Sequence, residues 1–181
     1  MIEYLDTPKV QKYDLVAKAL HWIMAILFVW QFTSAGLHLF AEDTPIEGFF
    51  WKWHYSVGFT LWVLVFLRGV WALANLKSRP DHSGLWLGGR AVTIGHLLMY
   101  ALMIAVPTLA ILRSAGNGRG LVVYGVTLIE RGRPEIPALV ELGSALHGLL
   151  GWTLLALIVG HIAMALYHGL VRRDGVLRRM V

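Results

Sequence analysis

Long apolar runs alternate with short polar segments along this chain, and there are four such runs. They cover about residues 16–38, 53–76, 91–112 and 145–171. Each is long enough to form an α-helix that crosses the roughly 30 Å of hydrocarbon in a bilayer. The pattern therefore predicts an all-α fold, an integral membrane four-helix bundle in which residues 1–181 make a single transmembrane domain.

Composition narrows the possible chemistry. The 181 residues are 57% hydrophobic and 15% charged, which is too apolar for an ordinary soluble domain, so we expect membrane lipid and no nucleic acid as a partner. The chain has no cysteine, which excludes covalently attached c-type haem, iron–sulfur clusters, disulfides and thiol nucleophiles. Histidine, methionine and carboxylate side chains remain as metal ligands.

Basic residues predict how the helices are oriented. Acidic side chains dominate the loop between the first two spans (Glu42, Asp43 and Glu47), whereas segment 113–141 is mixed in sign and its apolar run 121–129 is expected along the outer surface. By the positive-inside rule, the basic segments and both termini are cytoplasmic. The basic residues lie before the first span (Lys9, Lys12, Lys18), between the second and third (Lys77, Arg79, Arg90) and after the fourth (Arg172, Arg173, Arg178, Arg179).

Two histidines of the last span, His147 and His161, are fourteen residues apart. In an α-helix this spacing brings both rings to within roughly 40° of one direction and separates them by about 21 Å along the axis. With the predicted orientation, His21 in the first span shares the depth of His161, and His54 at the start of the second shares that of His147. The sequence thus predicts two levels with one histidine pair at each.

Paired imidazoles in apolar surroundings suit axial ligation of haem b iron. A flat macrocycle also needs a small side chain one helical turn from each ligand, and four residues after each histidine there is one. Three alternatives stay open: histidines that only form hydrogen bonds between helices, a zinc site, and methionine as an axial ligand. The small residues are Ala25, Gly58, Gly151 and Ala165, and the candidate methionines are Met24, Met99, Met103 and Met164.

In its motifs the chain resembles the prokaryotic cytochrome b561 proteins, which are related to the membrane cytochrome b subunits of nickel hydrogenases. The resemblance covers nearly the whole chain, and the order and spacing of the motifs make it specific. The motifs are Leu20-His21-Trp22; residues 53–58 (WHYSVG) with Arg68 beyond; residues 95–100 (GHLLMY) with Pro107; Leu146-His147-Gly148; Gly160-His161 with His168; and the ending 174–180 (DGVLRRM).

This resemblance implies a multi-pass protein of the bacterial inner membrane that carries two b haems, with His21, His54, His147 and His161 as ligands. It also implies electron exchange with a quinone. Some members are described as oxidising superoxide at the outer face and reducing ubiquinone. The two loops on the outer side depart most from the family pattern, which leaves the outer electron donor open.

Three further polar residues lie near the predicted cytoplasmic side. His168 is the first candidate, and His96 the second, to hydrogen-bond a quinone head group and supply protons. Both residues also suit interfacial anchoring or contact with haem propionates. Arg68 is the candidate counter-charge for a propionate of the inner haem, and snorkelling to lipid phosphate is its alternative. His38 and His82 are interpreted as solvated surface residues.

Two functions remain open. One is a quinone-linked oxidoreductase that works alone on a small outer donor; superoxide is one candidate, attracted by Arg113, Arg119, Arg131 and Arg133. The other is a membrane-anchor cytochrome b subunit that relays electrons for a dehydrogenase or hydrogenase partner. A haem-free transporter is disfavoured, because no carboxylate lies deep in any span.

Overall fold

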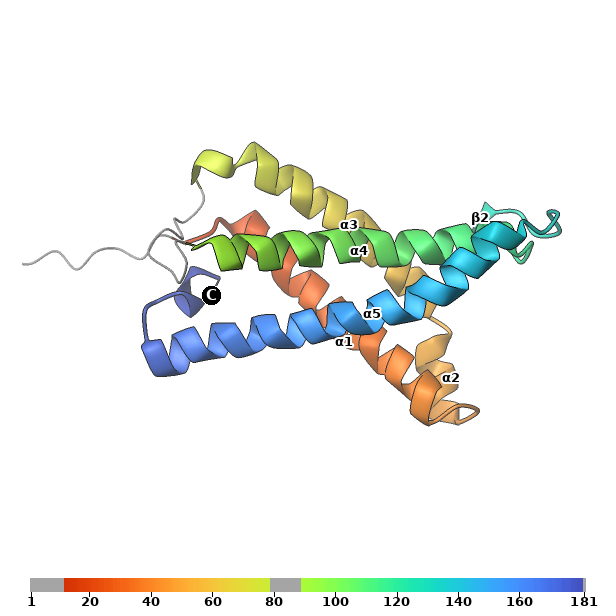
Figure 1. The fold of residues 1–181 in the computed structure, drawn as a ribbon, viewed down its shortest axis with the longest axis horizontal. Coiled ribbons are helices and arrows are strands. Elements are labelled where there is room, and N and C mark those ends of the chain that lie inside the picture. Colours follow the sequence, from red (N-terminus) through yellow and green to blue (C-terminus); the bar gives the residue numbers. More distant parts are fainter. Residues whose placement is uncertain (1–11, 79–88, 181) are drawn as a thin grey trace, which may run out of the picture.

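The computed structural model describes residues 12–78 and 89–180, and four long helices dominate it (Figure 1). Each is long and apolar enough to cross a membrane, which confirms the predicted all-α bundle. The expected spans fall inside these helices except at the ends of the second and the fourth. The helices are α1 Leu15–Phe40, α3 His54–Ala74, α4 Arg90–Gly116 and α5 Pro137–Leu166, the last continued by a π-helical turn, η3 Tyr167–Arg172.

A short helix, α2 Pro45–Trp51, lies between α1 and α3 and was not predicted. Its start has a common local signal: the Thr44 side chain accepts a hydrogen bond from the Glu47 backbone N–H, and Pro45 occupies the first turn. After α3, a single 3₁₀ turn, η1 Leu76–Ser78, follows. His82 and Arg79 lie outside the described residues.

The segment between α4 and α5 is more ordered than the sequence suggested. Strands β1 Leu121–Val123 and β2 Val126–Ile129 form an antiparallel hairpin. Helix α5 begins at Pro137, well before the expected start at 145, because proline suits the first helical turn. The first turns of α5 therefore extend the helix beyond its apolar part.

Glycines allow α4 and α5 to approach closely near the hairpin. A Cβ on Gly143 would lie 2.6 Å from the Cβ of Arg113 and 2.8 Å from the carbonyl oxygen of Leu109. A Cβ on Gly116 would lie 2.7 Å from that of Leu139. Small residues at such crossings permit the backbone packing that stabilises helix pairs in membranes.

Few side chains in the described part of the chain are buried, and six of the buried apolar ones form one small core. Many other apolar side chains on the long helices are exposed, as expected for a protein surrounded by lipid. The methionines Met24 and Met103 belong to this core and pack against aliphatic side chains. The remaining core residues are Val57, Leu61, Val65 and Leu154.

The described chain begins and ends at the same end of the bundle (Figure 1). The backbone N–H of Tyr13 donates to the carbonyl of Arg179, and the indole N–H of Trp22 donates to that of Met180 at 3.0 Å. A 3₁₀ turn, η4 Leu177–Arg179, lies in this returning segment. We call this the terminus end, and the opposite end, which carries α2 and the strands, the hairpin end. That the terminus end faces the cytoplasm stays a prediction.

Candidate functional site

Two histidine pairs lie inside the bundle at different levels. Toward the terminus end, the rings of His21 on α1 and His161 on α5 have centroids 6.3 Å apart, with their planes at 73°. Toward the hairpin end, the rings of His54 on α3 and His147 on α5 are 6.4 Å apart, at 76°. We call these the terminus-side pair and the hairpin-side pair. Helix α5 supplies one ring to each.

The ring separation suits a metal held between the two imidazoles. With a metal–nitrogen bond of about 2 Å on each side, the centroids of two imidazoles on opposite faces of one ion would lie about 6 Å apart. Both pairs have this separation. Within residues 12–78 and 89–180, no group of three or more His, Cys, Asp or Glu side chains is placed to hold a metal ion.

Hydrogen bonds orient the rings of the hairpin-side pair. Nδ1 of His147 lies 2.9 Å from the carbonyl oxygen of Val106, so this nitrogen donates. Nδ1 of His54 lies 3.1 Å from Oγ of Ser34. A hydrogen bond donated by Nδ1 fixes the tautomer of a metal-binding histidine and leaves its Nε2 as the basic atom. Both contacts therefore suit axial ligands.

The small residues leave space next to the rings. A Cβ on Gly151 would meet only the Cγ1 atom of Val106, at 3.9 Å. A Cβ on Gly58 would lie 3.1 Å from Nε2 of Gln31, and the same amide nitrogen is 3.1 Å from Nε2 of His54. The side chain of Gln31 is flexible, and it must turn away before His54 can bind iron. With that one change, the residues around the hairpin-side pair fit a haem.

A third histidine lies at the level of the terminus-side pair. The ring of His96 on α4 is 5.4 Å from that of His161, and its Nδ1 lies 2.8 Å from the carbonyl oxygen of Val92. The buried Nδ1 of His21 has no hydrogen-bond partner in the described part of the chain. The sequence indicates His96 only as a candidate quinone contact and does not predict its position beside His161.

Arg68 brings a positive charge to the terminus-side pair. Its guanidinium lies 5.9 Å from the ring centroid of Tyr100, and its charge acts on both His21 and His161. That Arg68 is the counter-charge of a haem propionate stays a prediction. A cation at this point suits an anionic group such as a propionate.

His168 lies beyond the terminus-side pair and is 7% exposed. Its Nδ1 is 2.6 Å from a carboxylate oxygen of Asp174, and Nε of Arg172 is 3.7 Å from the same oxygen. Partial burial tends to raise the pKa of Asp174. This effect of burial is outweighed by the hydrogen bonds that Asp174 accepts from His168 and from the Val176 N–H. The positive charges of His168 and Arg172 act in the same direction, so the pKa of Asp174 lies below its ordinary value. Sequence reasoning missed Asp174.

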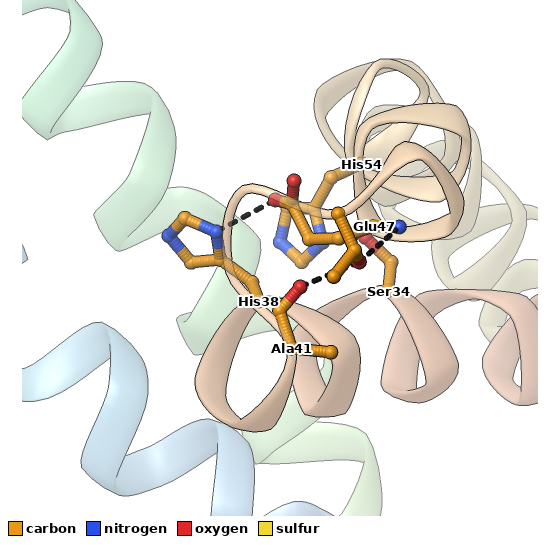
Figure 2. A network of polar contacts seen from close by, with 6 residues as sticks. Ser34, His38, Ala41, Glu47 and His54 are labelled. Carbon is orange, nitrogen blue, oxygen red and sulfur yellow. Dashed lines mark hydrogen bonds and ion pairs between the residues drawn. The ribbon is translucent and has the colours of Figure 1, made fainter.

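His38 is partly exposed, in keeping with its interpretation as a surface residue, but it also makes contacts that the sequence did not predict. Nδ1 of His38 is 2.8 Å from Oε1 of Glu47, a largely buried carboxylate, as Figure 2 shows. The ring of His38 also stacks on Trp51, with centroids 3.7 Å apart, and Trp51 lies 4.5 Å from the ring of His54. Glu47 and Trp51 both lie on α2, and because this helix was not predicted, no pattern in the sequence indicated that His38 contacts them.

Known proteins place the chain in a family. A family model described as "Prokaryotic cytochrome b561" matches residues 12–181. Cytochrome b561 homolog 2 of Escherichia coli (strain K12) is 27% identical over 183 residues, which span 99% of this chain and 95% of the relative. Cytochrome b561 homolog 1 of the same organism is 28% identical over 173 residues, which span 90% of this chain and 92% of the relative. The probable superoxide oxidase CybB of Yersinia pestis is 26% identical over 176 residues, which span 94% of this chain and 96% of the relative.

These matches cover the four helices and both histidine pairs, and they agree with the fold. The family implies b-type haem and electron transport, which suits paired imidazoles between apolar helices. The chain belongs to the prokaryotic cytochrome b561 family and is a multi-pass bacterial membrane protein that binds haem and transfers electrons.

Proposed function

We propose that this protein is a dihaem cytochrome of the inner membrane that moves electrons between a donor on the outer side and ubiquinone. The observation that carries the proposal is the pair of ring separations, 6.3 and 6.4 Å, at two levels of one helix. Haem b bound at each level would supply a one-electron redox centre. In this proposal His21 and His161 hold the inner haem, and His54 and His147 hold the outer one.

Spacing along α5 supports electron transfer across the membrane. The fourteen residues between His147 and His161 correspond to about 21 Å of helix, which is most of the roughly 30 Å thickness of the hydrocarbon core. Each histidine level then lies about 5 Å inside one boundary of that core. A donor at one surface and a quinone at the other are both within reach of the nearer level.

We place quinone reduction near His168. Reduction of a quinone to a hydroquinone consumes two electrons and two protons, so the site needs a group that takes up and releases protons. The imidazole of His168 is buried, and its partner Asp174 is partly exposed at the terminus end. In this arrangement His168 holds a proton toward the membrane, while Asp174 orients the ring and connects it to water. His96 is the second candidate.

The proposal of superoxide as the outer donor rests on the name of one relative and on the charges at the hairpin end. A relative is named a probable superoxide oxidase, and Arg113, Arg119, Arg131 and Arg133 are exposed at the hairpin end, where they would attract a small anion such as superoxide. Three acidic side chains of the α1–α3 connection oppose this attraction: Glu42, Asp43 and Glu47. We therefore expect the rate of encounter with superoxide to fall as salt rises, but only modestly.

Haem quantification and a redox titration of the purified protein test the core of this proposal. We expect two b haems per chain and two resolvable redox transitions. One haem per chain, or none, would contradict it.

A second experiment separates the two possible roles in electron transport. The isolated protein in liposomes is mixed with superoxide, and haem reduction is followed by its absorbance before ubiquinone is added. We expect fast reduction and then reoxidation. If the reduced protein is reoxidised by ubiquinone but superoxide does not reduce it, the donor is a different molecule and a partner subunit becomes the better explanation.

A further inference from the structure

We propose that the β-hairpin of residues 121–129 is a lipid-binding element. It inserts its tip among the acyl chains next to the headgroups of the leaflet at the hairpin end. Four helices account for the membrane spans, so the hairpin would be a fifth contact with the bilayer. The proposal takes the depth of the two histidine levels from the proposed function, but it does not depend on haem binding or on the direction of electron flow.

The hairpin sequence, LVVYGVTLI, contains no charged residue, whereas charged side chains stand at its base. Arg119 precedes it by two residues, and Glu130 and Arg131 follow it directly. Apolar segments with basic residues at one end are typical of elements that lie in a membrane interface, since the basic side chains reach the phosphates.

A tight turn fixes the tip. Val123 pairs with Val126, which leaves Tyr124 and Gly125 as the two turn residues, with φ of 49° and 85°. Two successive positive φ values define the turn type that matches the twist of a hairpin. Tyrosine rarely adopts this conformation, so contacts of Tyr124 must hold it there.

Helix α3 provides those contacts. The backbone N–H of Tyr124 donates to Oγ of Ser56 at 3.1 Å, and its hydroxyl is 3.0 Å from Oγ1 of Thr60. Ser56 and Thr60 follow His54 by two and six residues, which is about 3 and 9 Å further along the helix axis. The tip of the hairpin therefore lies deeper in the bundle than the level of the hairpin-side pair.

This depth puts the tip inside the bilayer. The hairpin-side pair lies about 5 Å within the hydrocarbon boundary if the two histidine levels are centred in a core of roughly 30 Å. Ser56 lies deeper still. On α3, Ser56 and Thr60 point at least about 120° away from His54, so the hairpin packs on a flank that does not face the histidine pair.

The two strands differ in what they contact. In β1, Leu121 and Val123 are 5% and 6% exposed and pack toward α3 and α4. In β2, Val126 and Leu128 are 61% and 47% exposed. At the depth given above, the surroundings of these side chains are acyl chains. A two-stranded hairpin leaves backbone groups unpaired along its edges, which confines it to the interface and away from the bilayer centre.

Because the chain has no cysteine, single-cysteine variants test the proposal directly. Val126→Cys and Leu128→Cys are labelled with the environment-sensitive fluorophore NBD in the full-length protein, reconstituted in phosphatidylcholine and phosphatidylglycerol vesicles. Quenching by aqueous iodide is compared with quenching by lipids that carry a doxyl group near the headgroup. The matched controls are Val29→Cys on the exposed face of α1 and Arg133→Cys in the loop after the hairpin.

We expect labels at 126 and 128 to resemble the label at 29, with doxyl quenching several-fold stronger than iodide quenching, and the label at 133 to show the reverse. Strong iodide quenching at 126 and 128 would overturn the proposal. So would a label shielded from both quenchers, because that result indicates a protein partner or a second copy on this face. A Tyr124→Phe and Ser56→Ala variant that retains its helical circular dichroism should shift the label at 126 toward iodide.

Discussion

The two histidine pairs are built alike but supported differently. At the hairpin-side pair, the chain itself holds Nδ1 of each ring: Ser34 contacts His54, and the carbonyl of Val106 accepts from His147. The rings are thus oriented before any cofactor binds, and a moderate shift of Gln31 is the one change that binding requires.

The terminus-side pair has less of this support and more charge. Among the described residues, Nδ1 of His21 is buried without a hydrogen-bond partner. The ring centroids of His96 and His161 are 5.4 Å apart, and the charge of Arg68 acts on both members of the pair. His168 lies seven residues beyond His161. Protonable groups therefore gather between this level and the terminus end.

One bundle can therefore hold two similar histidine pairs that suit different tasks. A site that only passes electrons needs fixed ligands, whereas a site that reduces a quinone also needs groups that move protons. We infer that the hairpin-side pair serves electron entry and the terminus-side pair serves the proton-coupled reaction.

Removal of a ligand should have the largest effect. We expect His147→Ala to abolish the hairpin-side haem and His161→Ala or His21→Ala to abolish the terminus-side haem, each leaving about one haem per chain because two axial nitrogens are needed. His96→Ala is the matched control and should keep both. Pyridine haemochrome assay and difference spectra measure this. Loss of haem in His96→Ala with retention in His21→Ala would reverse the assignment of the terminus-side pair.

Filling the space beside a histidine ring should have the second-largest effect. Gly151→Leu places a bulky side chain next to His147, where a porphyrin would lie, so we expect loss of the hairpin-side haem alone. Gly148→Leu is the control, because this neighbouring glycine has open space around it and is exposed. Equal haem content in the two variants would show that the ring does not lie against α5 at this point.

Neutralising Asp174 should slow only the transfer of electrons from haem to ubiquinone. Asparagine can still accept a hydrogen bond from His168 but carries no charge, so in Asp174→Asn we expect reoxidation of prereduced haem by ubiquinone to slow roughly tenfold or more. Reoxidation by ferricyanide, which takes no proton, should be unchanged. The control is Asp14→Asn, since Asp14 is another carboxylate at the terminus end, bonded to Trp71.

The pH dependence of the same variant follows from the pKa of Asp174. Because that pKa is lowered, the wild-type carboxylate stays ionised throughout the neutral and mildly acidic range. The ratio of wild-type to variant rates should therefore stay constant there and fall only when the pH drops through the lowered pKa. Equal slowing with ferricyanide would indicate a purely structural contact between Asp174 and His168.

Sequence reasoning succeeded where one helix sets the geometry. The spacing of His147 and His161 predicted two levels, because the α-helical repeat alone fixes direction and rise. It also predicted that His21 and His54 share the depths of His161 and His147, because successive spans alternate in direction, which makes α1 antiparallel and α3 parallel to α5.

It failed where geometry depends on irregular backbone or on a short connecting helix. The contact between His168 and Asp174 needs the π-helical turn and the positive φ of Arg173, neither of which has a pattern in the sequence. The contact between His38 and Glu47 needs α2, whose start at Thr44 and Pro45 was visible but was interpreted as loop.

Neutralising Arg68 should have the smallest effect, and it distinguishes the two levels. A nearby positive charge favours the reduced, less positive form of a haem, so Arg68→Gln should lower the midpoint potential of the terminus-side haem by roughly 60 mV, the one-electron equivalent of a tenfold change. The hairpin-side potential should barely move. Lys52→Gln at the hairpin end is the converse control, because Lys52 lies over the ring of Trp53 next to His54. If Arg68→Gln shifts both potentials equally, the charge does not belong to one level, and the assignment of Arg68 to a propionate there is wrong.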